Sequence, residues 1–328
     1  MISPIEKTRI ERLLCTFERN FRVTRLYAEY LEEYPEIISA EMVDTLTEDG
    51  AISKEEAIVA LLCEIFRLSF DDPADRAIIR DYITPSVRIL DGQKYKNDPY
   101  YKNIKVPEIT DGSWQLRHES YAPYRAVICD DIVFDGFREV PPLGFFTERF
   151  DFPAVLENGN EWMTLTPVDL DTCTEAIDAA RGKVVTFGLG LGYYAYMAAR
   201  KPEVESVTVI EKSRDVIALF KKHILPQFEC ADKIRIIEAD AFEYAELDMP
   251  SEKYDVAFVD TWRDGSDGAP MYERMRALEH LSEGTEFLYW IRGFLVSRLR
   301  ALKLEELIRS IERGEISTKD AEDILNNL

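Results

Sequence analysis

Histidine and cysteine are scarce in this chain, and neither is spaced for metal binding. The three histidines lie far apart in the sequence: His118, His223 and His280. The five cysteines are equally scattered: Cys15, Cys63, Cys129, Cys173 and Cys230. Without a C-x-x-C, H-x-E or H-E-x-x-H spacing a zinc site has little support, and an odd set of unpaired thiols is typical of a reducing compartment. We therefore predict no metal site.

Long apolar runs and export signals are also missing. No apolar run reaches the roughly 20 residues that span a bilayer, and the segment after Met1 lacks the basic-then-apolar pattern of a secretory signal. The chain has neither a G-x-S-x-G motif nor a P-loop lysine. We expect a cytoplasmic protein with no membrane partner.

Basic residues are too few to balance the acidic ones. The 328 residues include 40 Lys and Arg against 62 Asp and Glu, which gives a net charge of −22. Because nucleic-acid binding depends on neutralising phosphates, this charge argues against DNA or RNA, although a local basic patch can survive on an acidic protein. The length suits about two domains. We expect a small-molecule substrate.

The hydrophobic pattern changes along the chain. Up to about residue 85 it has helical spacing, and Ser53 with Glu56 forms a capping box that starts one helix, while Pro73 opens another. Between about 86 and 166 short apolar runs dominate, and Asn158-Gly159 predicts the tight turn of a hairpin. We expect an N-terminal helical domain over 1–105 and a small β or cover region over 106–166.

The remainder, 167–328, is expected to be a nucleoside-binding domain with C-terminal helices. Thr166-Pro167 begins a helix through Ala180, and the residues after Gly293 have helical character. In between, strand-like runs alternate with helical stretches: 184–187, 207–210, 234–237, 256–259 and 287–291. This alternation predicts an α/β fold, a Rossmann-like, doubly wound and mostly parallel sheet with right-handed crossovers.

A glycine-rich turn follows the first of these strands. Gly188, Gly190 and Gly192 stand in G-x-G-x-G spacing, whereas the dinucleotide fingerprint needs a glycine at Tyr193. This spacing favours a nucleoside without a pyrophosphate, and S-adenosylmethionine is the leading candidate. Phe187 and Leu189 belong to the same predicted cofactor loop, although glycines here can also simply shape a strand-to-helix turn.

Three carboxylates end the neighbouring strands, where an open parallel sheet binds its ligands. Glu211, about 20 residues past the turn, is placed to hold ribose hydroxyls, with Lys212 beside it. Asp240 can accept from an adenine amine, with Ala241 offering an amide, or it can simply cap a helix. Asp260 would lie beside the bound ligand and is the predicted catalytic residue, orienting the cofactor or accepting a proton.

Two further segments near these strands are open to interpretation. The glycines after Asp260 suggest a mobile loop over 260–270 that closes on the site, in which Trp262 flanks the acceptor or only packs the loop. Asp98-Pro-Tyr-Tyr101 is weakly similar to the D-P-P-Y signature of amino-group methyltransferases, and we interpret it as an aromatic-rich loop.

Taken together, the segments at 184–192, 207–226, 234–242 and 254–260 resemble class I S-adenosylmethionine-dependent methyltransferases. The spacing is closest to the spermidine-synthase-like branch. This resemblance implies that Gly188, Gly190 and Gly192 form the cofactor loop, with Glu211 at the ribose, Asp240 at the adenine and Asp260 at the reacting end.

The sequence departs from that family at several positions. Many methyltransferases carry an acid where this chain has Thr186, and spermidine synthases carry aspartates at the positions of Leu191 and Arg263, although Asp264 follows one residue later. Recognition of the cofactor's amino group must therefore be arranged differently. The usual terminal strand hairpin is also missing after Gly293, so either the sheet is shortened or strands from 106–165 complete it and supply an acceptor pocket.

Three functions remain open from the residues. The leading one is a methyltransferase with a small-molecule acceptor. The alternatives are a spermidine-synthase-like aminopropyltransferase, which the acidic composition favours and Leu191 opposes, and a non-catalytic nucleoside-binding protein. A homodimer is possible through apolar residues of the terminal helices: Phe294, Leu295, Leu299 and Leu302.

Overall fold

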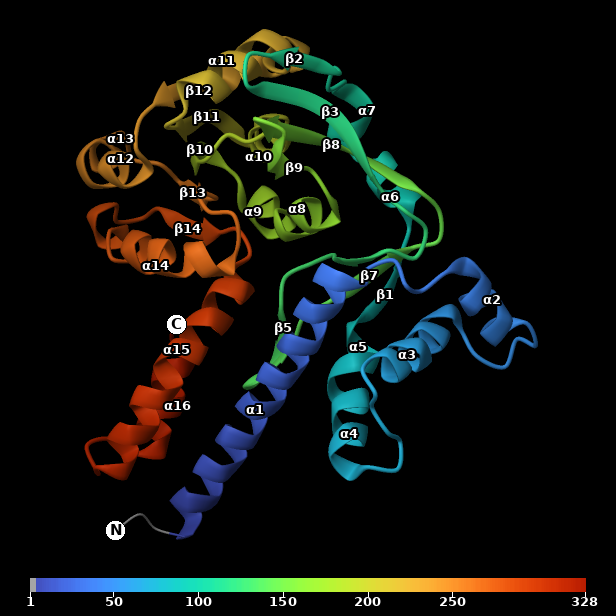
Figure 1. The fold of residues 1–328 in the computed structure, drawn as a ribbon. Helices are drawn as coiled ribbons and strands as arrows, with labels where there is room; N and C mark the ends of the chain where they lie inside the picture. The colour runs from blue at the N-terminus through green and yellow to red at the C-terminus, as the bar shows by residue number, and fades with distance from the viewer. Residues whose placement is uncertain (1–3) are drawn as a thin grey trace. The chain divides into compact units, whose positions relative to one another are not determined.

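The computed structural model describes residues 4–328 and divides the chain into two compact units (Figure 1). Unit 1 combines three separate segments, 4–90, Ala122–Glu148 and Arg292–Leu328, and unit 2 combines Asp91–Tyr121 with Arg149–Ile291. The expected boundaries at 105 and 166 do not coincide with these divisions. The C-terminal helices group with the N-terminal ones, and Glu322 near the C-terminus pairs with Arg9 near the N-terminus at 2.6 Å.

Unit 1 is mostly helical. Its helical elements are α1 (Pro4–Glu33), α2 (Ala40–Thr47), α3 (Lys54–Ile65), α4 (Pro73–Ile78), the π-helix η1 (Ile79–Ile83), α5 (Thr84–Ser86), α15 (Arg292–Glu312) and α16 (Thr318–Asn326). Its strands are β1 (Val87–Leu90), β4 (Ala126–Ile128), β5 (Val133–Asp135), β6 (Arg138–Val140) and β7 (Leu143–Phe146). Strands β1, β7 and β4 form one small sheet, and β5 pairs with β6 as a hairpin.

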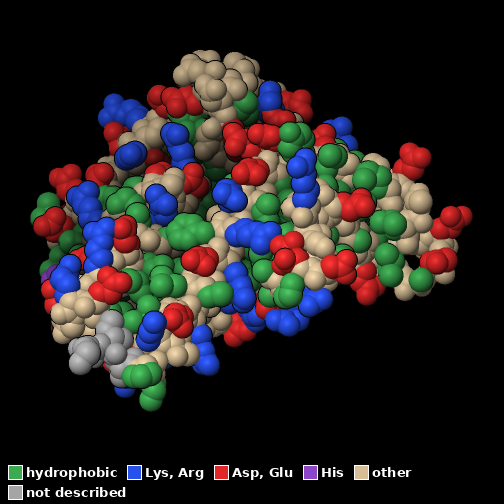
Figure 2. Space-filling model, turned by 60° about the horizontal axis from the view of Figure 1, so that its bottom comes forward, with side chains coloured by type: hydrophobic (Ala, Val, Ile, Leu, Met, Phe, Trp, Pro, Cys, Tyr) green, Lys and Arg blue, Asp and Glu red, His purple; other side chains and the backbone are tan. Residues whose placement is uncertain are grey.

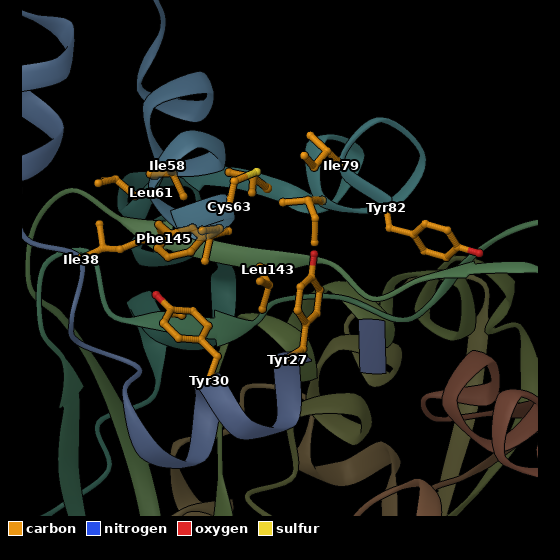
Figure 3. Close-up of a cluster of buried hydrophobic side chains, with 14 of the residues drawn as sticks. Tyr27, Tyr30, Ile38, Ile58, Leu61, Cys63, Ile79, Tyr82, Leu143 and Phe145 are labelled. Atoms are coloured by element: carbon orange, nitrogen blue, oxygen red, sulfur yellow. The ribbon is translucent and has the colours of Figure 1, made fainter. Parts of the chain in front are cut away.

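The helix starts predicted for unit 1 are confirmed. Ser53 and Glu56 satisfy each other's backbone amides at the start of α3, and Asp72 caps α4 with Pro73 as its first residue. One apolar core joins these helices to the small sheet, and Tyr27, Leu143 and Phe145 are among its most buried members (Figure 3). Burial of such side chains is the main stabilising term of this unit.

Unit 2 contains the α/β part of the chain. Its strands are β2 (Ile109–Asp111), β3 (Trp114–Tyr121), β8 (Phe150–Glu157), β9 (Asn160–Thr164), β10 (Gly182–Phe187), β11 (Val204–Glu211), β12 (Ile234–Glu238), β13 (Val256–Val259) and β14 (Glu286–Tyr289). Its α-helices are α6 (Gly92–Lys96), α7 (Pro99–Asn103), α8 (Pro167–Thr172), α9 (Thr174–Ala179), α10 (Tyr193–Ala199), α11 (Arg214–His223), α12 (Ala241–Leu247), α13 (Met249–Glu252) and α14 (Gly265–Arg276). Short 3-10 turns complete it: η2 (Leu225–Gln227), η3 (Ala231–Lys233) and η4 (Glu279–Leu281).

The predicted parallel sheet is confirmed. Its five strands are all parallel and follow the order β12-β11-β10-β13-β14. The chain winds outward in one direction from β10 to β12 and in the other from β13 to β14, so right-handed crossovers place helices on both faces. This order is that of a doubly wound, Rossmann-like sheet.

The sheet is shortened rather than completed from the N-terminal side. Within residues 4–328, the strands of 106–165 pair only among themselves or with β1, and β2-β3-β8-β9 forms a separate antiparallel sheet of unit 2. The idea that they extend the parallel sheet is therefore wrong. The hairpin within them is confirmed, since Asn158 and Gly159 have φ of 52° and 79° between β8 and β9.

The helix expected from Thr166 to Ala180 is two short helices. Thr166 caps α8 in a reciprocal bond with Asp169, and Cys173 lies between α8 and α9.

No helix within residues 4–328 is both long enough and apolar enough to cross a bilayer.

Candidate functional site

The carboxyl ends of β10, β11 and β13 bring the predicted site residues to one edge of the parallel sheet. The turn after β10 carries the glycines, Glu211 ends β11 and Asp260 directly follows β13. These strands are neighbours in the sheet, with Phe187 opposite both Ile210 and Val259. The amide of Asp260 extends this ladder by donating to the carbonyl of Phe187 at 2.8 Å.

The glycine turn depends on close backbone approach. Gly188 has φ of 102°, and a Cβ there would lie 1.9 Å from the carbonyl oxygen of Asp260. At Gly190 a Cβ would meet the thioether of Met163 at 2.6 Å. Met163 of strand β9 therefore lies directly against the turn, and the cover role of the region 106–166 stays a prediction. Gly192 is the N-cap of α10.

Glu211 ties the turn to the end of β11. This buried carboxylate accepts from the amide of Leu189 at 3.2 Å and from the amide of Ser213 at 2.7 Å, one bond at each oxygen. Each carboxylate oxygen has two lone pairs, so both retain capacity for a further donor. The side chain is therefore a fixed acceptor beside the glycine turn.

Asp260 has the most perturbed carboxyl group of this edge. Burial raises its pKa to about 8, and the nearby negative charges of Asp169 and Glu211 add to the rise. Within residues 4–328 no hydrogen bond to its carboxyl oxygens is formed. A half-buried acid without a hydrogen-bond partner is costly when ionised, and such groups cluster at functional sites.

Asp169 and Cys173 join this acidic cluster, and the sequence interpretation missed both. Asp169 accepts from the amide and hydroxyl of Thr166, at 2.7 and 2.8 Å, while burial raises its pKa to about 6. Burial, followed by the charges of Asp260 and Asp169, also raises the pKa of the Cys173 thiol. The T-x-x-D pattern from Thr166 to Asp169 was a usable signal for the cap, but not for the proximity of Asp260.

The remaining predicted cofactor residues lie nearer the surface. Asp240 caps α12, its Oδ1 accepting from the amides of Phe242 at 3.0 Å and Glu243 at 3.2 Å. The capping role foreseen for Asp240 is therefore confirmed, and its adenine role stays a prediction. Ala241 is the first residue of α12, and Lys212 is exposed next to Glu211.

Of the three positions where family acids are missing, Thr186 and Leu191 are buried and Arg263 is exposed. Thr186 lies inside β10, and Leu191 packs into the interior with its carbonyl accepting from the hydroxyl of Tyr100 at 2.6 Å. The amide of Leu191 donates only to the sulfur of Met163, a weak acceptor, at 3.1 Å. The residues at 98–101, expected to form a loop, instead begin helix α7 with Asp98 as its N-cap, and Tyr100 of this helix supports the turn.

The mobile loop expected over 260–270 is mostly helix. Asp264 and Asp267 form a capping box that starts α14 at Gly265, so only the residues before it form a loop. Trp262 is buried and stacks on Tyr289 with ring centroids 6.3 Å apart, and its indole N–H finds no acceptor in the described part of the chain. Trp262 therefore packs the segment.

Histidine, cysteine and acidic side chains of residues 4–328 form no group of three or more arranged to hold a metal ion.

The homodimer surface is smaller than expected, because Leu295 and Leu299 are buried within unit 1 while Leu302 is 58% exposed. The dimer stays a prediction.

No family model matches the chain, and no curated protein matches it. Among solved structures, spermidine synthase from Thermotoga maritima is 16% identical, with a TM-score of 0.31 over 45% of this chain and 56% of its own. A spermidine synthase in complex with the transition state analogue AdoDATO is 17% identical, with a TM-score of 0.33 over 45% and 58%. Precorrin-8W decarboxylase from Methanobacterium thermoautotrophicum is 21% identical, with a TM-score of 0.28 over 36% and 60%.

This chain spans 56–60% of the length of these three proteins. The chain is similar to these proteins, but its fold is established by the strand order of unit 2. With β12-β11-β10-β13-β14 all parallel and the glycine turn directly after the central strand β10, unit 2 has the Rossmann-like, class I methyltransferase type of fold that its sequence resembles.

Proposed function

We propose that unit 2 binds S-adenosylmethionine and transfers its methyl group to a small-molecule acceptor. The observation that carries this proposal is the half-buried carboxyl of Asp260 beside the glycine turn, which has no hydrogen-bond partner within residues 4–328. Desolvation and two neighbouring carboxylates hold it largely protonated at neutral pH. A cationic ligand is the partner that lets this group ionise, and a sulfonium is a cation.

The residues present fit this cofactor at both of its ends. Glu211 is held in place by two amides and still has lone pairs for ribose hydroxyls. The amide of Leu191 has only a thioether as acceptor and is available to a stronger one. Asp169 and Asp260 together offer carboxylates for an ammonium or sulfonium, which replaces the acids missing at Thr186 and Leu191.

When bound, S-adenosylmethionine supplies an electrophilic methyl group next to a positively charged sulfur. The contribution of this chain is to position the two reactants and exclude water, which can account for much of such a rate. Asp260, once ionised by the bound cation, accepts the proton that an acceptor hydroxyl or amine loses. Met163 of β9 packs against the turn at Gly190.

An aminopropyltransferase is the second candidate. The paired acids Asp169 and Asp260 also suit a cationic amine acceptor, which supports this alternative. The burial of Leu191, where spermidine synthases carry an aspartate, opposes it. The two candidates differ in whether the carboxylated or the decarboxylated cofactor binds more tightly.

Calorimetric titration of the full chain tests the proposal. We expect micromolar binding of S-adenosylmethionine and S-adenosylhomocysteine, weaker binding of the decarboxylated cofactor, and none of NAD. Glu211→Gln keeps the side-chain volume and should weaken binding about tenfold or more, since it removes charge-assisted hydrogen bonds. Glu205→Gln, an exposed position earlier on β11, is the matched control. Unchanged affinity of Glu211→Gln would place the site elsewhere.

A further inference from the structure

A cavity lies entirely within unit 1 and takes no part in the proposed methyl transfer. It has a volume of about 400 Å³, within the range of small-ligand sites. Its lining comes from α1, η1, the β5–β6 hairpin and α16: Arg9, Arg12, Leu13, Thr16, Arg19, Asp81, Tyr82, Asp135, Phe137, Arg138 and Glu322. Four arginines against three carboxylates form this lining, on a chain whose net charge is −22.

The arginines are concentrated by the periodicity of α1. Spacings of three and seven residues place three of them on one face of the helix: Arg9, Arg12 and Arg19. Arg138 faces the same cavity from the β5–β6 hairpin. Figure 2 turns the lower side of Figure 1 forward, and there arginine and lysine side chains are interspersed with carboxylates.

The carboxylates of the cavity are already engaged by other cations. Glu322 pairs with Arg9 at 2.6 Å, and Asp135 pairs with Arg138. Asp81 accepts two bonds of 2.7 Å from Arg80, which lies outside the lining, and it also faces Arg138 at 3.4 Å. The hydrogen bonds from Arg80, with the charges of Arg138 and Arg19, lower the pKa of Asp81, so it stays ionised.

Donor groups are left over once these pairs are made. In the described part of the chain, the guanidinium groups of Arg12 and Arg19 form no hydrogen bond and no ion pair. The Nε of Arg138 is buried and also lacks an acceptor. Guanidinium groups bind planar or tetrahedral oxyanions through paired hydrogen bonds, so the missing partner is an anion with several oxygens.

The frame of the cavity is fixed in advance. Asn20 of α1 donates to the carbonyl of Phe137 at 2.7 Å and accepts from the hydroxyl of Tyr82 at 2.8 Å. These bonds hold the hairpin and η1 against α1. Phe137 and Leu13 add an apolar wall. Because the hydrogen bonds already fix these elements, little conformational entropy is lost when a ligand binds.

We propose that this cavity binds a small organic oxyanion, whose phosphate or carboxylate groups are held by Arg12 and Arg19. The test is calorimetric titration of the full chain with two probes, inorganic pyrophosphate and citrate. One-site binding in the millimolar range or tighter is expected for at least one probe. Tighter pyrophosphate binding identifies a phosphate ligand, and tighter citrate binding identifies a carboxylate ligand.

Variants on α1 distinguish a built site from general attraction. Replacing Arg12 and Arg19 together by Gln should lower the affinity for the tighter-binding probe by about tenfold for each side chain removed. Arg25→Gln, on the same helix but outside the cavity, should leave affinity unchanged. A double Lys variant keeps both charges but loses the planar fork, and it should bind several-fold more weakly even if the Gln variant is unstable.

Binding of neither probe at millimolar concentration would overturn the inference. It would also be overturned if both double variants retained the affinity of the parent chain, or if Arg25→Gln lost as much as the double Gln variant. None of these outcomes depends on S-adenosylmethionine binding, so this site and the proposed function can fail separately.

Discussion

The acidic cluster of unit 2 and the arginine-lined cavity of unit 1 shift the pKa of an aspartate in opposite directions. Asp260 is half-buried among other acids, with no hydrogen-bond partner for its carboxyl group in the described residues, and its pKa rises to about 8. Asp81 is enclosed by arginines, and the pKa of that carboxyl falls below its ordinary value. In the first arrangement a bound cation would stabilise the ionised acid. In the second, the acids already pair with arginine side chains and hold them in position.

The site edge of unit 2 depends on the close approach of two backbone segments, at Gly188 and Asp260. Gly188→Ala would place a Cβ 1.9 Å from the carbonyl of Asp260, so we expect a loss of at least about 3 kcal/mol in unfolding free energy. Urea denaturation measures it. Gly284→Ala is the control, because Gly284 also has positive φ, 90°, but no atom within 4 Å; its cost should be only about 1 kcal/mol. Equal costs would show that the turn can relax.

Replacing Asp260 by Asn should stabilise the protein at alkaline pH. The folded chain keeps a proton on Asp260 up to pH about 8, whereas the unfolded chain loses it near pH 4, so stability falls as pH rises through this window. Asp260→Asn removes that loss. Between pH 6 and 8.5 we expect the variant to gain about 2–3 kcal/mol relative to the parent chain, measured by urea midpoints. A constant difference across pH would contradict the raised pKa.

Asp169→Asn isolates the like-charge contribution. Asparagine keeps an oxygen for the Thr166 cap but removes the negative charge near Asp260. The pKa of Asp260 should fall by roughly one pH unit, measured by carbon-13 carboxyl titration in NMR. An unaltered titration would leave burial as the whole cause.

Asp81→Asn gives the opposite and smallest effect. The pKa of Asp81 is lowered in the folded state, so its stabilisation is present above the unfolded value near pH 4 and is lost as pH falls below it. Because its partners are partly exposed, we expect a loss of only about 0.5–1 kcal/mol at pH 7. Thermal denaturation at pH 7 checks the sign, and a gain in stability would contradict the pairing.

Local patterns predicted the elements of this molecule better than their grouping. The glycine turn, the five strands of the sheet and the caps at Ser53 and Asp240 depend on neighbours within a few residues, so the sequence shows them. The joining of α15 and α16 to the N-terminal helices depends on contacts hundreds of residues apart. No local pattern reports such contacts.

The candidate site was predictable to the same extent. Glu211 and Asp260 follow from the rule that ligands bind at the carboxyl ends of parallel strands. The nearness of Asp169 to Asp260 is a tertiary contact, which the capping pattern of α8 does not encode. The start of α14 at Gly265 was missed because two glycines suggested a loop, although the D-x-x-D cap was visible.

The most direct test of the account is the proton count on cofactor binding. S-adenosylmethionine is titrated at pH 7 in two buffers of different ionisation enthalpy, with S-adenosylhomocysteine, which lacks the sulfonium charge, as the comparison. We predict release of close to one proton with S-adenosylmethionine, much less with S-adenosylhomocysteine, and no difference between them in Asp260→Asn. Equal proton release for both ligands in the parent chain would contradict a cation-binding role for Asp260.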